Sequence, residues 1–272
     1  MKQDTREKLL ISAEQTYRDF SASLVPGEEN MLGVRLPELR RLAKQLAGAN
    51  WEAELATEDI YFEEVMLRGL IIGYVTLKMT PERALDYIRD FIPRVTNWSL
   101  CDSVFMKMDI LRKDRALTWE FLLPYLQSGE EFKVRVALII MMSHLLRCDA
   151  DGKTISRMRK VSMEDLGGEA ENKERERASG YLGDIFEVIN RPFEEGHYAH
   201  MAAAWLVAES FCCFPALTDA FLRSCRLDNA TYNKALQKIV ESKIPDAEVK
   251  DYIRSRKRGK EKEERENGNL SD

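Results

Sequence analysis

The residues that could do chemistry begin with a tryptophan and an aspartate four positions apart, Trp98 and Asp102. On a continuous helix this spacing places both side chains on one face. The face of an indole ring attracts a cation by about 0.5–2 kcal/mol, depending on desolvation, and the carboxylate adds a negative charge beside it. The pair therefore predicts a recess for a positively charged group. Trp205, from a much later segment, is a candidate for the opposite wall of that recess.

Each of these residues also has a structural interpretation. A lone tryptophan at helical spacing most often packs in a core or at its rim, which would account for Trp98 and Trp205. Asp102 could be a solvated helix acid, or it could pair with Lys107 or Arg135. Arg135 begins a strongly apolar segment, where a salt bridge is ordinary, and structural ion pairs can mimic functional ones. The four residues by themselves, without further context, favour these structural interpretations.

The elements that must position these residues are predicted to be helices. The 272 residues are 44% hydrophobic and 32% charged, which allows both a sizeable core and a solvated exterior. The strict alternation typical of strands is nearly absent. The clearest helix is expected from Val134 to Leu146, where apolar residues recur every three or four positions and form one wide stripe.

Short helices joined by short connectors favour an all-α array of paired helices around one concave surface. A compact helical bundle is the alternative. We expect one domain over residues 1–252, in which the polar stretch 150–180 is a solvated helix or mobile insertion, and a basic then acidic, disordered tail over 253–272. Spacing, capping residues and first-turn prolines predict further helices over 36–46, 57–61 leading into 63–78, 84–91, 97–108, 117–126, 199–211, 217–224 and 231–242.

The net charge of −5 argues against a broadly basic nucleic-acid binder. Any contact with nucleic acid must therefore come from a local basic face. Two local groups of cations could provide it: Arg35, Arg40, Arg41 and Lys44, and later Lys234 with Lys238. An exposed, solvated helix face is an equally ordinary explanation for each group.

The five cysteines are few, odd in number and mostly set in apolar helical patterns, which indicates reduced intracellular thiols. No C-x-x-C or H-x-x-x-H spacing supports a zinc site, and we expect neither a metal nor another cofactor. No apolar run approaches the ~20 residues that a bilayer span needs. The charged start, residues 1–8, lacks a signal-peptide stretch, so we expect a cytoplasmic protein without membrane contact.

Four segments, in order, resemble motifs of the AlkD-like DNA alkylation repair family, and the resemblance runs from about residue 8 to about residue 253. It implies a right-handed α-α superhelix of HEAT-like (ARM-type) repeats. It also implies a DNA glycosylase that excises cationic N3- or N7-alkylated purines from double-stranded DNA. Separately, nothing in the sequence demands more than a monomer. The segments are Leu32-Gly33-Val34-Arg35-Leu36-Pro37-Glu38-Leu39-Arg40-Arg41-Leu42-Ala43-Lys44, Asn97-Trp98-Ser99-Leu100-Cys101-Asp102, Lys133-Val134-Arg135-Val136-Ala137 and Met201-Ala202-Ala203-Ala204-Trp205.

The family resemblance assigns the site to Trp98, Asp102, Arg135 and Trp205. An alkylated purine that already carries positive charge needs little help to leave, whereas the sugar develops oxocarbenium character. One carboxylate, that of Asp102, could stabilise the sugar cation and orient water, with Trp98 and Trp205 as walls. Arg135 would hold a backbone phosphate, and the further candidates for phosphate contact are Arg40, Lys44 and Lys234.

The chain departs from the family pattern at two places beside this site. Ala208 precedes Glu209 where the family often has an arginine before the acid, and Ser99 follows Trp98 where an acid is common. The missing arginine predicts a weaker hold on phosphate. The alternative function is therefore a non-enzymatic HEAT-like scaffold that binds protein or structured nucleic acid.

Overall fold

Paired helices make up most of the architecture in the computed structural model, which describes residues 1–149, 153–177 and 180–259. Outside these ranges lie most of the expected disordered tail and part of the polar 150–180 stretch. The α-helices are α1 Gln3–Ile11, α2 Gln15–Leu24, α3 Leu36–Ala47, α4 Trp51–Leu55, α5 Phe62–Val75, α6 Pro81–Phe91, α7 Trp98–Phe105, α8 Arg115–Leu126, α9 Glu131–Ile140, α10 Gly168–Arg177, α11 Tyr181–Ile189, α12 His197–Cys213, α13 Pro215–Ser224, α14 Asn229–Glu241 and α15 Ala247–Ser255.

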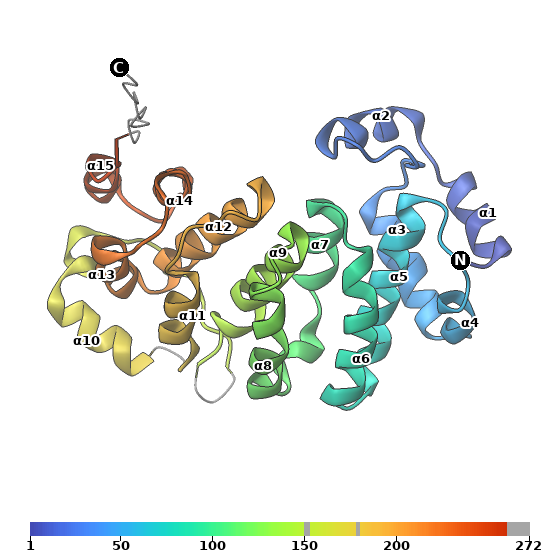
Figure 1. The fold of residues 1–272 in the computed structure, drawn as a ribbon, viewed down its shortest axis with the longest axis horizontal. Coiled ribbons are helices and arrows are strands. Elements are labelled where there is room, and N and C mark those ends of the chain that lie inside the picture. Colours follow the sequence, from blue (N-terminus) through green and yellow to red (C-terminus); the bar gives the residue numbers. More distant parts are fainter. Residues whose placement is uncertain (150–152, 178–179, 260–272) are drawn as a thin grey trace, which may run out of the picture.

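One row of helices carries the architecture. Helices α3, α5, α7, α9, α12 and α14 pack in this order, each against the next, while α4, α6, α8, α13 and α15 pack as second members of the pairs. In the view of Figure 1 the molecule is arched, because α2 near one end and α15 near the other lie higher than α7 and α9 in the middle. Within the described ranges there is no strand, only two isolated bridges. The predicted all-α superhelix of helical repeats is therefore confirmed.

Local sequence signals fix where several helices begin. Thr80 accepts a hydrogen bond from the backbone N–H of Arg83, with Pro81 in the first turn of α6. Asn97 caps α7 and Asp114 caps α8 in the same way. Such caps satisfy backbone donors that have no partner inside the helix. The predicted starts near these residues therefore agree with the structure to within a few positions.

The predicted helix from Val134 to Leu146 is central and is buried on all sides rather than along one stripe. Helix α9 passes at Met141 into a π-helical turn that ends at Leu145. The turn contains His144, which is fully buried; its Nε2 lies 2.6 Å from the carbonyl oxygen of Phe105, and its Nδ1 lies 3.1 Å from Nε of Arg112. Neighbouring elements thus surround this helix where the amphipathic pattern suggested one apolar face.

The structure departs from the expected helix pattern in several places, and α1, α2, α4, α11 and α15 lie outside the predicted helix ranges. Residues 57–61 are not helical. Arg68 of α5 instead donates hydrogen bonds to the backbone oxygens of Leu55 and Thr57 and to the carboxylate of Asp59. In the polar stretch, Glu174 of α10 is buried and accepts hydrogen bonds from two backbone N–H groups in the first turn of α13, at 2.9 and 3.2 Å. Helix α10 therefore packs against α13.

The boundary expected after residue 252 falls inside a helix, since α15 continues to Ser255. Beyond the helix, Arg258 donates hydrogen bonds to the carbonyl oxygens of Leu227 and Cys225, at 2.6 and 3.0 Å. Residues 253–259 are thereby held against the connector between α13 and α14. In the described parts of the chain, no helix combines the length and the apolar character needed to cross a bilayer.

Candidate active site

Helix α7 positions the first two candidate residues. The side chain of Asn97 accepts a hydrogen bond from the backbone N–H of Leu100 at 3.0 Å and donates one to Glu28 at 3.3 Å. The cap fixes the start of the helix, and Trp98 and Asp102 follow one turn apart on it. Both side chains are partly buried, so the indole and the carboxylate share a partly sheltered helix face, as their spacing predicted.

Asp102 and Arg135 form a two-pronged salt bridge. Arg135 Nε donates to Asp102 Oδ1 at 3.1 Å, and Nη2 donates to Oδ2 at 2.8 Å. The third guanidinium nitrogen, Nη1, donates to the carbonyl oxygen of Tyr198 at 2.8 Å. The side chains are only 14% and 6% exposed, respectively. This geometry joins α7, α9 and α12 and holds the carboxylate in one orientation.

Burial and the guanidinium act on Asp102 in opposite directions. Desolvation raises the pKa of the Asp102 carboxyl above its usual value, while the hydrogen bonds and the charge of Arg135 oppose that rise. The neighbouring thiol of Cys101 is fully buried, and burial raises its pKa well above the usual range. Of the two adjacent groups, the carboxylate is thus the one able to carry charge near neutrality.

Trp98 lies against the first part of the chain. Its indole N–H donates to the carbonyl oxygen of Leu24, the last residue of α2, at 3.0 Å. A cavity of about 270 Å³ opens beside it between α2, α3, α5 and α7. Its lining includes Ser99, the residue that stands where an acid is common, and Ser103. Helix α2 therefore covers one side of the Trp98 ring.

Trp205 lies in a different cavity, also of about 270 Å³, between α12 and α14. The ammonium of Lys238 lies 5.9 Å from the centre of its ring. The lining residues of this cavity do not include Trp98, so the two indoles do not enclose one common pocket. Trp98 lies on α7 and Trp205 on α12, and α9, which carries Arg135, stands between these two helices in the row.

An arginine lies beside Glu209 although α12 does not supply it. Arg157, from the polar stretch, donates to both carboxylate oxygens of Glu209, through Nε at 2.7 Å and through Nη2. The Glu209 side chain is 5% exposed. Next to Arg157, the backbone N–H of Met158 donates a hydrogen bond to the carbonyl oxygen of Cys212 at 2.8 Å. The sequence analysis missed Arg157, because nothing local connects it to a carboxylate 52 positions away.

The basic residues of the first motif divide into two kinds. Arg35 pairs with Glu14 and Arg41 pairs with Glu38. Arg40 and Lys44, the two phosphate candidates, have no carboxylate partner among the described residues. Arg40 lines a cavity of about 290 Å³ with residues of α5 and α7, and Lys44 is exposed. Two of the four cations are therefore available to a ligand.

Residues 32–34, at the start of the same motif, form a tight turn that is bound to Glu63. The backbone N–H groups of Leu32, Gly33 and Val34 all donate to the carboxylate of Glu63, at 2.6–3.2 Å. Gly33 has a φ of +90°, and a Cβ there would lie 2.5 Å from the carbonyl oxygen of Glu14. Only glycine fits this left-handed turn at such a close approach. The turn places α3, with Arg40 and Lys44, beside α5.

Comparison with known proteins shows the family to which the chain belongs. A sequence model described as DNA alkylation repair enzyme matches residues 5–165. The match covers more than half of the 272 residues, and the chain belongs to this family. It includes Trp98, Asp102 and Arg135 and ends before Trp205 and Lys234. A search of curated proteins found no match.

Proposed function

We propose that the protein is a DNA glycosylase that excises cationic N3- and N7-alkylated purines from double-stranded DNA. Membership of the DNA alkylation repair enzyme family supports a role in alkylation repair. The observation that carries the finer proposal is the Asp102 carboxylate, held by two hydrogen bonds from Arg135 one helical turn after Trp98. A fixed anion beside an aromatic ring suits a substrate whose base and sugar share positive charge.

The mechanism needs only one carboxylate. An N3- or N7-alkylated purine is already cationic, and breaking its glycosidic bond neutralises the base, so no acid has to protonate the leaving group. Positive charge develops on the sugar, where Asp102 stabilises it and orients the attacking water. Ordinary glycoside hydrolysis uses a second carboxyl group as the acid. The role of Asp102 requires its ionised form, so base release should decrease as the pH falls through its raised pKa.

Arg135 acts first as the positioning residue for Asp102. Three of its five N–H groups donate to Asp102 and Tyr198, which leaves two for a DNA phosphate. Trp98 and Trp205 would flank the damaged nucleotide from α7 and α12. Arg40, Lys44 and Lys234 would contact phosphates along the row of helices, which provides the local basic face that a chain with a net charge of −5 needs.

The direct test is base release from methylated duplex DNA. Wild-type protein should release 7-methylguanine or 3-methyladenine, and Asp102→Asn should reduce the single-turnover rate by about 10²–10³-fold. Asp109→Asn, which removes an exposed acid near the end of α7, is the matched control and should keep the wild-type rate. Full activity in Asp102→Asn would rule out the carboxylate mechanism. No base release by the wild type, together with no salt-dependent DNA binding, would favour a scaffold.

A further inference from the structure

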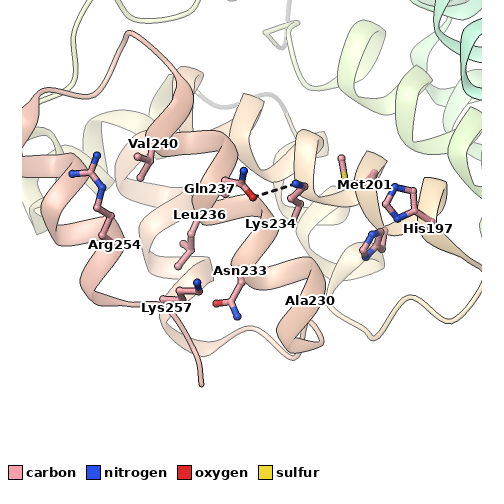
Figure 2. Close-up of a pocket in the computed structure, with 11 residues that line it drawn as sticks. His197, Met201, Ala230, Asn233, Lys234, Leu236, Gln237, Val240, Arg254 and Lys257 are labelled. Atoms are coloured by element: carbon pink, nitrogen blue, oxygen red, sulfur yellow. Dashed lines mark hydrogen bonds between the residues drawn. The ribbon is translucent and has the colours of Figure 1, made fainter. Parts of the chain in front are cut away.

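A cavity of about 570 Å³ lies between α12, α14 and α15 (Figure 2). Part of its wall is apolar, and the apolar side chains are Met201, Ala230, Leu236 and Val240. Its polar residues come from all three helices. The volume lies in the range of pockets that hold small organic ligands, which combine an apolar wall with a few polar groups.

The charges around this cavity favour an anion. Lys234, Arg254 and Lys257 line it, and no Asp or Glu is among the lining residues. Lys234 donates to the side-chain oxygen of Gln237 at 3.1 Å, and Lys257 has no ion pair within the described chain. Arg254 pairs only with the exposed Asp251. Two lysines therefore bring positive charge to the cavity without a compensating carboxylate.

Two histidines at the start of α12 complete the lining. The rings of His197 and His200 lie 5.1 Å apart, and Nε2 of His200 is buried without a hydrogen-bond partner in the described structure. Burial lowers the pKa of His200, so this ring is neutral near pH 7. The cavity thus combines apolar side chains, a neutral aromatic ring and a cationic rim.

This cavity lies next to the smaller cavity that Trp205 lines, and both lie between α12 and α14. Met201 precedes Trp205 by four residues on α12, and Lys234 precedes Lys238 by four residues on α14. Residues at this spacing lie one above the other on a helix. Since Lys238 lies 5.9 Å from the centre of the Trp205 ring, the two neighbouring cavities follow the same junction of α12 and α14.

The geometry points to a nucleotide-binding pocket at this junction. The base would lie against Met201, Leu236 and Val240, and its phosphate would be held by Lys234 and Lys257. Such contacts recognise the aromatic face and the charge of any phosphorylated nucleoside. An unpaired nucleotide of bound DNA and a free nucleotide share this chemistry. The alternative in which the nucleotide belongs to bound DNA rests on the proposed function.

Three variants separate the contributions of charge and of space. Lys234→Gln with Lys257→Gln removes the two unpaired cations, and Ala230→Trp fills the cavity without changing its charge. Ala230 is exposed, so the larger side chain does not disturb the core. Lys78→Gln with Lys173→Gln is the control, because both lysines are exposed and neither lines the cavity.

The probes are dAMP, inorganic phosphate, a fully paired duplex, and the same duplex with one unpaired adenosine. Wild type and control should bind dAMP, and the bulged duplex should bind about tenfold tighter than the paired duplex. Both cavity variants should lose dAMP binding and this preference. A bulge preference assigns the pocket to DNA, whereas dAMP binding without it assigns the pocket to a free nucleotide.

The inference fails if neither dAMP binding nor the preference for the bulged duplex differs between wild type and the two cavity variants. It also fails if inorganic phosphate competes as well as dAMP. The pocket proposal and the glycosylase proposal can be tested independently of each other. Wild-type protein that shows the bulge preference but releases no methylated purine would keep the pocket and remove the glycosylase. Base release by a wild-type protein that shows neither nucleotide binding nor a bulge preference would support the glycosylase and rule out the pocket.

Discussion

Arg135 holds Asp102 through two hydrogen bonds, at 2.8 and 3.1 Å, and anchors itself to the Tyr198 carbonyl oxygen with a third. The carboxylate is therefore oriented from a helix other than its own. Because both side chains are nearly buried, removing either one leaves the other without its partner in a poorly solvated site. Stability and function should accordingly be coupled at this pair.

Arg135→Ala should lower the free energy of unfolding by about 3 kcal/mol, since an uncompensated buried charge is costly. Arg135→Lys keeps the charge but loses the fork, and should cost about half as much. Urea unfolding measures both, and combining each with Asp102→Asn gives the coupling energy. Arg41→Ala, which breaks a solvent-screened surface pair with Glu38, should leave the free energy of unfolding close to that of wild type. Additive effects at Asp102 and Arg135 would contradict the pairing.

Arg157→Ala should loosen the polar stretch beside Trp205, because Glu209 would lose its two-pronged partner and keep only Arg147, at 3.9 Å. The expected loss of stability is about 1–2 kcal/mol, since Arg157 itself is half exposed. The amide of Met158 should exchange its hydrogen faster, as measured by hydrogen–deuterium exchange. Arg159→Ala, at an exposed position, should leave that exchange unchanged. Equal protection in both variants would show that the ion pair does not hold this segment.

His144 should make the protein less stable in mild acid. Burial lowers the pKa of His144 from 6.5 to about 4, so below pH 6.5 the unfolded chain takes up a proton that the folded protein does not. This contribution is fully present above pH 6.5 and is lost as the pH falls toward 4. The stability advantage of wild type over His144→Gln should therefore shrink by about 2–3 kcal/mol between pH 7.5 and 4.5.

Urea denaturation at both pH values measures the His144 effect, and carboxyl groups common to the two proteins cancel in the difference. A constant difference between wild type and His144→Gln across this range would show that His144 takes up its proton normally in the folded protein.

Arg40 and Lys44 should contribute to DNA binding through phosphate contacts. Replacing both by glutamine should reduce the slope of log affinity against log salt concentration by roughly 1.8, about 0.9 for each lost contact. Fluorescence anisotropy with a duplex at several salt concentrations gives the slope. Arg41→Gln is a matched control on the same helix, because Arg41 is paired with Glu38. An unchanged slope in the double variant would remove this part of α3 from the DNA-binding surface.

The sequence by itself determined the helical class, several helix starts and the order of the motifs. These properties depend on residues three or four positions apart, on capping residues such as Asn97 and on first-turn prolines such as Pro81. Such signals act within one or two turns and need no knowledge of the remaining chain. The common face of Trp98 and Asp102 follows from the same local rule.

Tertiary structure alone decided which partner each buried charge has. Asp102 could have paired with Lys107 on sequence grounds, but the packing of α7 against α9 brings Arg135 to it from 33 positions away. Packing also brings Arg157 to Glu209 and places the two indoles in separate cavities. Many cations along a helical array are chemically equivalent, so the relative placement of whole helices, which no local pattern encodes, selects among them.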